Sequence, residues 1–138
     1  MRLRGNAKVD LISRVPLLAG CSKRELALVA RIADEIAQPV GTVLTAEGKP
    51  GREFCILIAG DAEVRQRGKR LRLLSSGDFF GEIALILDAP RSATVTATSD
   101  VRLLVIDRLA FRWLLSESPS IQGKVLEALA MRLADESL

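Results

Sequence analysis

Histidine is absent from this sequence of 138 residues, and cysteine occurs only twice. A chain without imidazole lacks the commonest protein metal ligand and the usual activator of serine or cysteine nucleophiles. Cys21 and Cys55 are widely separated and have neither metal-binding nor redox spacing. Cys55 lies within an apolar run, which predicts a buried, reduced thiol. We therefore expect no catalytic residues, no metal site and no cofactor, and we interpret the chain as a protein other than an enzyme.

Long apolar runs and a strong charge imbalance are also missing. No stretch approaches the roughly 18 apolar residues that a membrane-spanning helix needs. No apolar segment follows the charged start MRLRGNAKVD, as a secretory signal would require. The formal net charge is +3, which is too small by itself to indicate nucleic-acid binding. These features predict a cytoplasmic protein without membrane insertion and without direct contact to nucleic acid.

Basic residues do gather in one segment, in which charged and apolar residues alternate around a glycine. The pattern favours a β-hairpin with one solvated basic face, and the alternative is a surface patch for anions or for a partner. The residues concerned are Arg65, Arg67, Lys69, Arg70 and Arg72, on either side of Gly68.

Two zones at the ends of the chain are expected to be helical. In residues 1–37 apolar side chains recur at helical spacing, Pro16 ends or bends the first helix, and Ser22 with Glu25 forms a capping-box pattern. In residues 107–138 Asp107 can cap a helix in which Trp113 is expected to be buried. A last helix can begin at Ser118 and Pro119. Its apolar stripe indicates either a homodimer contact through the C-terminal helix or a contact with a missing domain.

The central zone, residues 38–106, consists of short β-type runs separated by glycines. Turns are expected at Gly60-Asp61 and at Gly77-Asp78. The runs are TVLT, EFCILIAG, AEVRQR, RLRLL, ATVTAT and VRLLVI. Many short strands of this kind indicate a roll or sandwich. The 138 residues therefore predict one domain of the α+β class, an antiparallel β-roll (a double-stranded, jelly-roll-like barrel) flanked by N-terminal and C-terminal helices.

The segment most informative about function is FGEIALILDAPRSATV, residues 80–95. Gly81 allows a ligand to approach the backbone closely, and the start of a short helix after it would present free N–H groups to an anion. Arg91 can bind two anionic oxygens through its planar guanidinium, and Ser92 adds a hydroxyl. Glu82 would repel a phosphate unless it faced another group, such as a sugar hydroxyl. A phosphate joined to a ribose with a free 2′-OH meets both requirements.

This segment resembles the phosphate-binding cassette of cyclic nucleotide-binding domains. The pattern of that cassette is F-G-E, an apolar residue, Ala or Gly, Leu, a spacer, and then P-R-[A/S/T]-A-[T/S]-V. The flanking segments VPLLAGCS, ILIAGDAEV and SPSIQGKVLEALAMRL resemble the entry helix-turn, the glycine-containing hairpin and the terminal helix of the family. The pattern is most similar to bacterial members, namely the sensor domains of cyclic nucleotide-gated channels and catabolite-activator-type regulators.

The resemblance implies a cyclic mononucleotide ligand, cAMP or cGMP, and a role for each matching residue. Gly81, Ile83 and Ala84 would bind the phosphate through backbone N–H groups, and Glu82 would accept the ribose 2′-OH. Arg91 would pair with the cyclic phosphate. The other residues assigned to the ligand are Ser92 and Ala93 in the cassette, Ile58, Val64, Leu73 and Leu74 as an apolar wall for the purine, and Arg132 with Leu133 as a lid.

The expected function is a regulatory sensor in which ligand binding moves the flanking helices and so controls an effector protein or a fused domain. Two alternatives stay open: a fragment of a cAMP-responsive transcription regulator lacking its DNA-binding domain, and an interaction scaffold without a ligand. Because the sequence has neither a helix-turn-helix nor transmembrane helices, a stand-alone sensor or an excised domain is expected. Ser92 permits a contact to guanine without requiring one, which leaves the base preference undecided.

Overall fold

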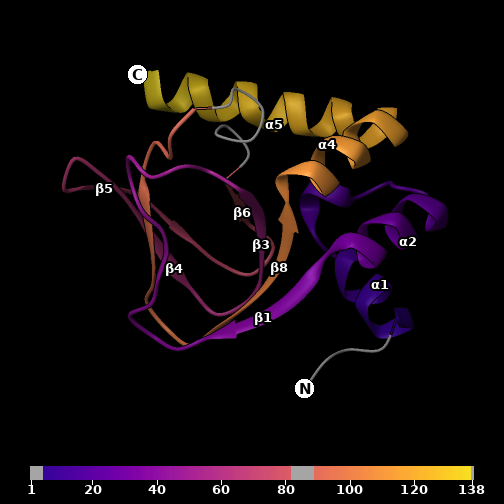
Figure 1. Ribbon diagram of the computed structural model, residues 1–138, viewed down its shortest axis with the longest axis horizontal. Helices are drawn as coiled ribbons and strands as arrows, with labels where there is room; N and C mark the ends of the chain where they lie inside the picture. The colour runs from indigo at the N-terminus through magenta and orange to yellow at the C-terminus, as the bar shows by residue number, and fades with distance from the viewer. Residues whose placement is uncertain (1–4, 82–88, 138) are drawn as a thin grey trace.

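The computed structural model describes residues 5–81 and 89–137, and at 5–7 and 132–137 it describes the backbone alone. Helices lie at both ends of the chain and strands lie between them (Figure 1). The helices are α1 (Gly5–Ser13), the short 3-10 helix η1 (Pro16–Leu18), α2 (Lys23–Ile32), α4 (Arg108–Glu117) and α5 (Pro119–Ser137). The strands are β1 (Asp34–Gln38), β2 (Val43–Thr45), β3 (Glu53–Ala59), β4 (Ala62–Gln66), β5 (Lys69–Leu74), β6 (Phe79–Phe80), β7 (Thr94–Ala97) and β8 (Val101–Asp107).

The strands form two antiparallel sheets of four strands each, in the orders β1-β8-β3-β6 and β2-β7-β4-β5. The helices gather on one side of this roll, with α1 and α2 beside the first sheet and α5 running along the top in Figure 1. This arrangement confirms the predicted fold class, an antiparallel β-roll with helices from both ends of the chain. In the described part of the chain no helix is long and apolar enough to cross a membrane.

Two hydrophobic cores share the central strands β3 and β8. Side chains alternate along these strands, so that one set faces the helices and the next faces the interior of the roll. Because both faces are covered, each strand reads in the sequence as a continuous apolar run rather than as an alternation. The helix-facing set includes Phe54, Ile56, Leu104 and Ile106, and the interior set includes Cys55, Leu57, Leu103 and Val105.

The predicted helix starts are confirmed by their capping hydrogen bonds. Ser22 and Glu25 form a complete capping box at the start of α2. The Asp107 carboxylate accepts from the Ala110 N–H at 2.9 Å, and the Ser118 hydroxyl accepts from the Ile121 N–H at 3.2 Å. Each cap satisfies a backbone donor that the first turn of a helix leaves without a partner.

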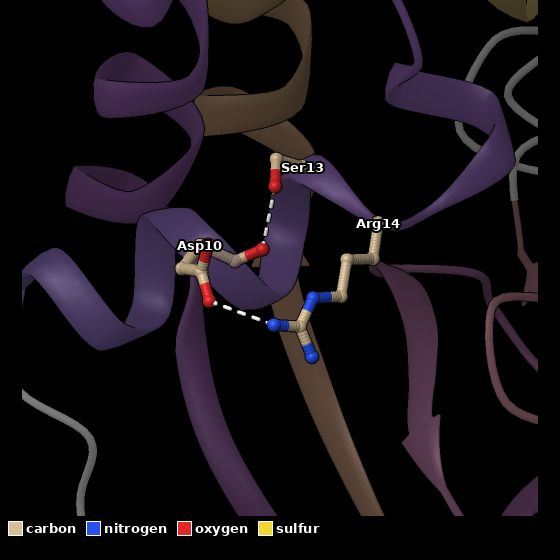
Figure 2. Close-up of polar contacts among 3 residues, drawn as sticks. All are labelled: Asp10, Ser13 and Arg14. Carbon is tan, nitrogen blue, oxygen red and sulfur yellow. Dashed lines mark hydrogen bonds and ion pairs between the residues drawn. The ribbon is translucent and has the colours of Figure 1, made fainter.

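Helix α1 ends before Pro16, as the sequence predicts, and local polar contacts close its last turn (Figure 2). The Ser13 hydroxyl donates to the Asp10 carbonyl at 2.6 Å, and the Arg14 guanidinium donates to the Asp10 carboxylate at 3.0 Å. All three groups are exposed, so these contacts favour the helix end without contributing much to global stability.

The N-terminal helical zone is shorter than predicted, because α2 ends at Ile32 rather than near Ala37. The next residues form β1, which pairs with β8 from Asp34 opposite Val105 to Gln38 opposite Val101. Ile36 packs against the interior core. Pairing with a strand some seventy residues later in the sequence therefore decides the structure of this segment, and local helical spacing does not reveal such a partner.

The structure bears on two expectations about the C-terminal helices. Trp113 is 40% exposed instead of buried, because it lies four residues after Leu109 on the face of α4 opposite the buried Phe111 and Leu114. The apolar stripe of α5 is covered only in part, since Leu126 is 55% exposed, and the homodimer contact stays a prediction. Ile121 and Val125 are each 1% exposed and belong to the helix-side core.

Strands β4 and β5 are joined by a two-residue turn in which Arg67 and Gly68 have φ angles of 52° and 79°. Two successive positive φ values are typical of the type I′ hairpin turn, whose favoured first residue is asparagine. The Arg67 N–H also donates to the Glu47 carboxylate at 3.0 Å. An arginine at this position is therefore conformationally strained.

We expect Arg67→Asn to raise the free energy of unfolding by about 0.5 kcal/mol, because asparagine tolerates the left-handed conformation better than arginine. Gly68→Ala should have the opposite effect and lower the free energy of unfolding. Because nothing lies within 4 Å of a Cβ at this position, the loss of stability reflects the φ of 79° alone. Urea denaturation measures both changes. A loss of stability in Arg67→Asn would contradict the strain assigned to the turn.

Candidate ligand-binding site

Gly81 follows the short strand β6, whose Phe79 and Phe80 pair with Ile56 and Cys55 of β3. Its φ is +95°, and a Cβ at this position would lie 2.5 Å from both the Arg91 Nη1 atom and the Glu53 carbonyl oxygen. Glycine is thus required twice, by the backbone conformation and by the close approach of other groups. The sequence predicted a close approach at Gly81. The group that makes it in this structure is the Arg91 guanidinium.

Arg91 is the central polar residue of the site and is only 8% exposed. Its Nη1 donates to the Gly81 carbonyl at 3.0 Å, and its Nη2 donates to the Glu53 carbonyl at 2.6 Å. The guanidinium therefore joins the start of β3 to the end of β6. A buried charge of this kind is tolerated only where hydrogen bonds replace those it had with water.

The backbone of Arg91 is held by the loop between β2 and β3. Its N–H donates to the Lys49 carbonyl at 2.8 Å, and its carbonyl accepts from the Gly48 N–H at 2.9 Å. Next to it, Pro50 and Pro90 form an isolated antiparallel bridge. These contacts fix both ends of the arginine side chain, so that the guanidinium is positioned before any ligand arrives.

Cys55 lies on the interior face of β3, two residues after Glu53, whose carbonyl accepts from Arg91. The thiol is free and buried, as the sequence predicted. Burial raises the pKa of the Cys55 thiol to about 12; the negative charge of Glu53 adds to this effect, and the positive charge of Arg91 opposes it. At neutral pH the group is therefore a protonated, apolar part of the interior core rather than a nucleophile.

We expect one thiol of the two to react with the disulfide reagent DTNB in the native protein. Cys21 is half-buried and should react slowly, whereas Cys55 should react only after denaturant opens the roll. The chromophore released before and after denaturation counts the accessible thiols. A Cys21→Ser variant that still reacts at once under native conditions would contradict the burial of Cys55.

The residues after Arg91 lead from the guanidinium to the interior of the roll. Ser92 is exposed, and its carbonyl accepts from the Gln66 side-chain amide at 3.0 Å. Ala93 is half-buried and packs against the interior core, and β7 begins at Thr94. Arg91, Ser92 and Ala93 thus lie in one short segment between the buried charge and the apolar interior.

The apolar wall predicted for the purine is only partly assembled. Val64 and Leu74 are 8% and 3% exposed and belong to the interior core. Leu73 is 63% exposed and pairs with Glu63, so it lies on the outer face of its sheet. Ile58 packs with the helix-side core. Leu73 and Ile58 are therefore not part of the wall formed by Val64 and Leu74.

Sequence reasoning missed Arg72, which the register places opposite Val64 on the inner face. Its side chain is half-buried. Counting by twos from the buried Leu74 would have identified it, because residues two apart in a strand share a face. A second cation thus lies near the apolar wall, on the β5 side of the roll.

Several predicted site residues lie outside what the structure describes. Glu82, Ile83 and Ala84 fall within residues 82–88. Arg132 and Leu133 lie in helix α5, for which the structure describes only the backbone at these positions. Their assigned contacts stay predictions. Among the described residues, no group of three or more His, Cys, Asp or Glu side chains could hold a metal ion.

The described geometry suits an anion carried by an apolar or aromatic group. Arg91 offers a preorganised planar cation, Gly81 leaves no side chain beside it, and the interior core supplies apolar surface a few residues away. Electrostatic attraction is strong here because a buried cation is shielded little by water. Recognition of a small anionic ligand is therefore the chemistry that this end of the roll supports.

Comparisons with known proteins point to the same chemistry. The family model described as "Cyclic nucleotide-binding domain" matches residues 38–118. The cAMP-dependent protein kinase regulatory subunit of Pyricularia oryzae is 36% identical over 108 residues, which cover 77% of this chain. The aligned part is 28% of the fungal protein, so the chain spans little more than a quarter of that relative's length.

Two solved structures share the fold. PKAR CBD2 with bound Sp-2Cl-cAMPS matches with a TM-score of 0.81 at 29% identity, covering 99% of this chain and 96% of that one. The Catabolite Activator Protein of Thermus thermophilus matches with a TM-score of 0.81 at 26% identity, covering 88% of this chain and 60% of that one. Both similarities agree with the roll and flanking helices described above.

Proposed function

Because the chain belongs to the cyclic nucleotide-binding domain family, we propose that it binds cAMP inside the roll and acts as a regulatory sensor rather than as an enzyme. The observation that carries the proposal is the buried Arg91 guanidinium, fixed at the junction of β3 and β6. The choice of cAMP is supported by a relative named as a cAMP-dependent regulatory subunit and by a structural neighbour with a bound cAMP analogue.

In this proposal Arg91 pairs with the cyclic phosphate, which is a monoanion at neutral pH. Backbone N–H groups at Gly81, Ile83 and Ala84 complete the phosphate contacts, and Glu82 accepts the ribose 2′-OH. Ser92 donates to a phosphate oxygen, beside Ala93. The purine packs against Val64 and Leu74, and Arg132 covers it from α5. Water is excluded from the phosphate–guanidinium pair, which strengthens the attraction.

Regulation follows from the connection of the site to the helices. Strand β8 leads directly into α4 through the Asp107 cap, and α4 packs against α5 and β3. A ligand that binds one arrangement of these helices better than another shifts the population toward it. The effector is a partner protein or a domain fused to this one, and we propose that the domain acts in the cytoplasm.

Isothermal titration with cAMP, cGMP and 5′-AMP tests the proposal. We expect binding of cAMP, weaker or equal binding of cGMP, and no binding of 5′-AMP, whose phosphate is neither cyclic nor linked to the 3′-oxygen. Nucleotide recovered after long incubation and separated by chromatography should be unchanged cAMP. Absence of binding to both cyclic nucleotides would overturn the sensor in favour of a ligand-free scaffold, and conversion of cAMP to 5′-AMP would overturn the non-enzymatic assignment.

A further inference from the structure

The hairpin of β4 and β5 has a larger net positive charge than the chain as a whole. Residues 62–74 carry five basic side chains and one carboxylate, whereas the whole chain has a net charge of +3. The remainder of the protein is thus slightly acidic in net terms. In Figure 1 this hairpin projects from the roll on the side away from α1 and α2. Arg65, Arg67, Lys69 and Arg70 are exposed to solvent, whereas Arg72 is half-buried.

Several of these cations form no ion pair with the residues that the structure describes. Arg65 forms an ion pair with Glu63 at 2.7 Å and donates to the Gly68 carbonyl. By contrast, Arg67, Lys69 and Arg70 are exposed, and no ion pair joins them to another residue within 5–81 or 89–137. The register sets Arg70 directly opposite Arg65, a like-charge pair that disfavours the hairpin by itself. An anionic partner would remove this repulsion.

The same segment is a free sheet edge. Strand β5 is the last strand of its sheet and pairs only with β4. In the described part of the chain no backbone hydrogen bond joins residues 69–74 to any other element. The outer edge of a six-residue strand therefore presents unpaired N–H and C=O groups, which can bind another extended chain.

Apolar side chains lie among the cations of this edge. Leu71 is 41% exposed and Leu73 is 63% exposed. Cations that merely protect an edge from aggregation would not need exposed leucines between them. A nucleic acid or another polyphosphate would use the cations, but neither the leucines nor the backbone groups. An extended peptide with alternating acidic and apolar residues would use all three.

We propose that β5 is a docking strand for an acidic, extended peptide segment of a partner protein, which adds to the β2-β7-β4-β5 sheet as a fifth strand. Main-chain hydrogen bonds to β5 supply affinity, and the cations select acidic sequences. Lys69 and Arg70 provide the charge on the strand, Arg67 provides it at the turn, and Leu71 with Leu73 contacts the apolar side chains of the peptide. This surface does not include the buried Arg91 site.

Fluorescence anisotropy with a labelled peptide of alternating glutamate and valine residues tests the proposal. Lys69→Glu combined with Arg70→Glu should lower the affinity by about tenfold or more. The matched control reverses the same charge at two exposed helix positions, Lys23→Glu with Arg24→Glu, and should leave the affinity unchanged. Circular dichroism verifies that both variants fold. Equal losses in the two double variants would overturn a specific surface and leave only long-range attraction.

A second probe separates strand addition from simple charge attraction. The same peptide, N-methylated at alternate residues, keeps its carboxylates but loses the N–H groups that would face β5. It should bind at least about tenfold more weakly. Unchanged affinity of the methylated peptide, tighter binding of heparin or duplex DNA than of the peptide, or no binding of the peptide at all would each overturn the proposal. Isothermal titration with cAMP is repeated on the Lys69→Glu/Arg70→Glu variant. Unchanged cAMP binding there shows that a loss of peptide affinity is independent of ligand binding inside the roll.

Discussion

Arg91→Leu should weaken cAMP binding by about a hundredfold or more, because it leaves the cyclic phosphate desolvated without its cationic partner. The same substitution removes the donors of the Gly81 and Glu53 carbonyls. The free energy of unfolding should therefore fall by about 1–3 kcal/mol. Isothermal titration measures the first effect and urea denaturation the second.

Two further variants separate charge from folding in this experiment. Arg91→Lys keeps the positive charge and loses the planar fork, so it should bind better than Arg91→Leu but less tightly than the unmodified protein. Arg24→Leu removes an exposed arginine and should change neither quantity. Arg132→Ala is expected to cost less than Arg91→Leu, since a lid contact stays partly wet. Equal losses for Arg91→Leu and Arg132→Ala would show that the two roles are wrongly divided.

The second large effect is expected for Gly81→Ala. A Cβ would stand 2.5 Å from both the Arg91 Nη1 atom and the Glu53 oxygen, on a backbone with φ of +95°. Either the guanidinium or the strand must move, so stability should fall by about 2 kcal/mol or more. Because the group displaced is the one proposed to bind the phosphate, cAMP affinity should fall as well.

Two other glycines supply the controls for Gly81→Ala. At Gly60 a Cβ would lie 2.2 Å from the Asp100 carbonyl oxygen, away from the site, and at Gly41 the φ is +90° with nothing within 4 Å. Gly60→Ala should destabilise the fold, and Gly41→Ala should do so by backbone strain alone. Both should bind cAMP normally under conditions where they remain folded. Normal cAMP binding by folded Gly81→Ala would refute the link between this glycine and the placement of Arg91.

Local signals in the sequence predicted much of this fold because their physics is local. A capping box needs only Ser22 and Glu25, and a helix N-cap needs only Asp107 and the backbone that follows it. The segment FGEIALILDAPRSATV predicted that Gly81 and Arg91 bind the same phosphate, which stays a prediction. The structure shows that the Arg91 guanidinium donates to the Gly81 carbonyl. The sequence did not reveal that Arg91 also donates to the Glu53 carbonyl on β3.

The errors arose where the structure depends on pairing or packing that the local sequence does not reveal. β1 was assigned to a helix because its partner β8 lies some seventy residues later in the sequence. The apolar wall included Leu73 because its face depends on the register with β4, and that register shifts between Val64 and Arg65. Trp113 is exposed because α4 presents Phe111 and Leu114 to the core, which uses one side of the helix only.

Because both cores share β3 and β8, the protein is expected to unfold as one unit. Neither core can unfold by itself, since each takes part of its buried side chains from the same two strands. Amide protons in β3 and β8 should therefore exchange with deuterium only through global opening, and at the same rate in both strands. The free edge at β5 and the helix ends should exchange sooner. The interior of the roll and the helices thus form a single cooperative unit, and whatever stabilises the interior also slows the unfolding of the helices.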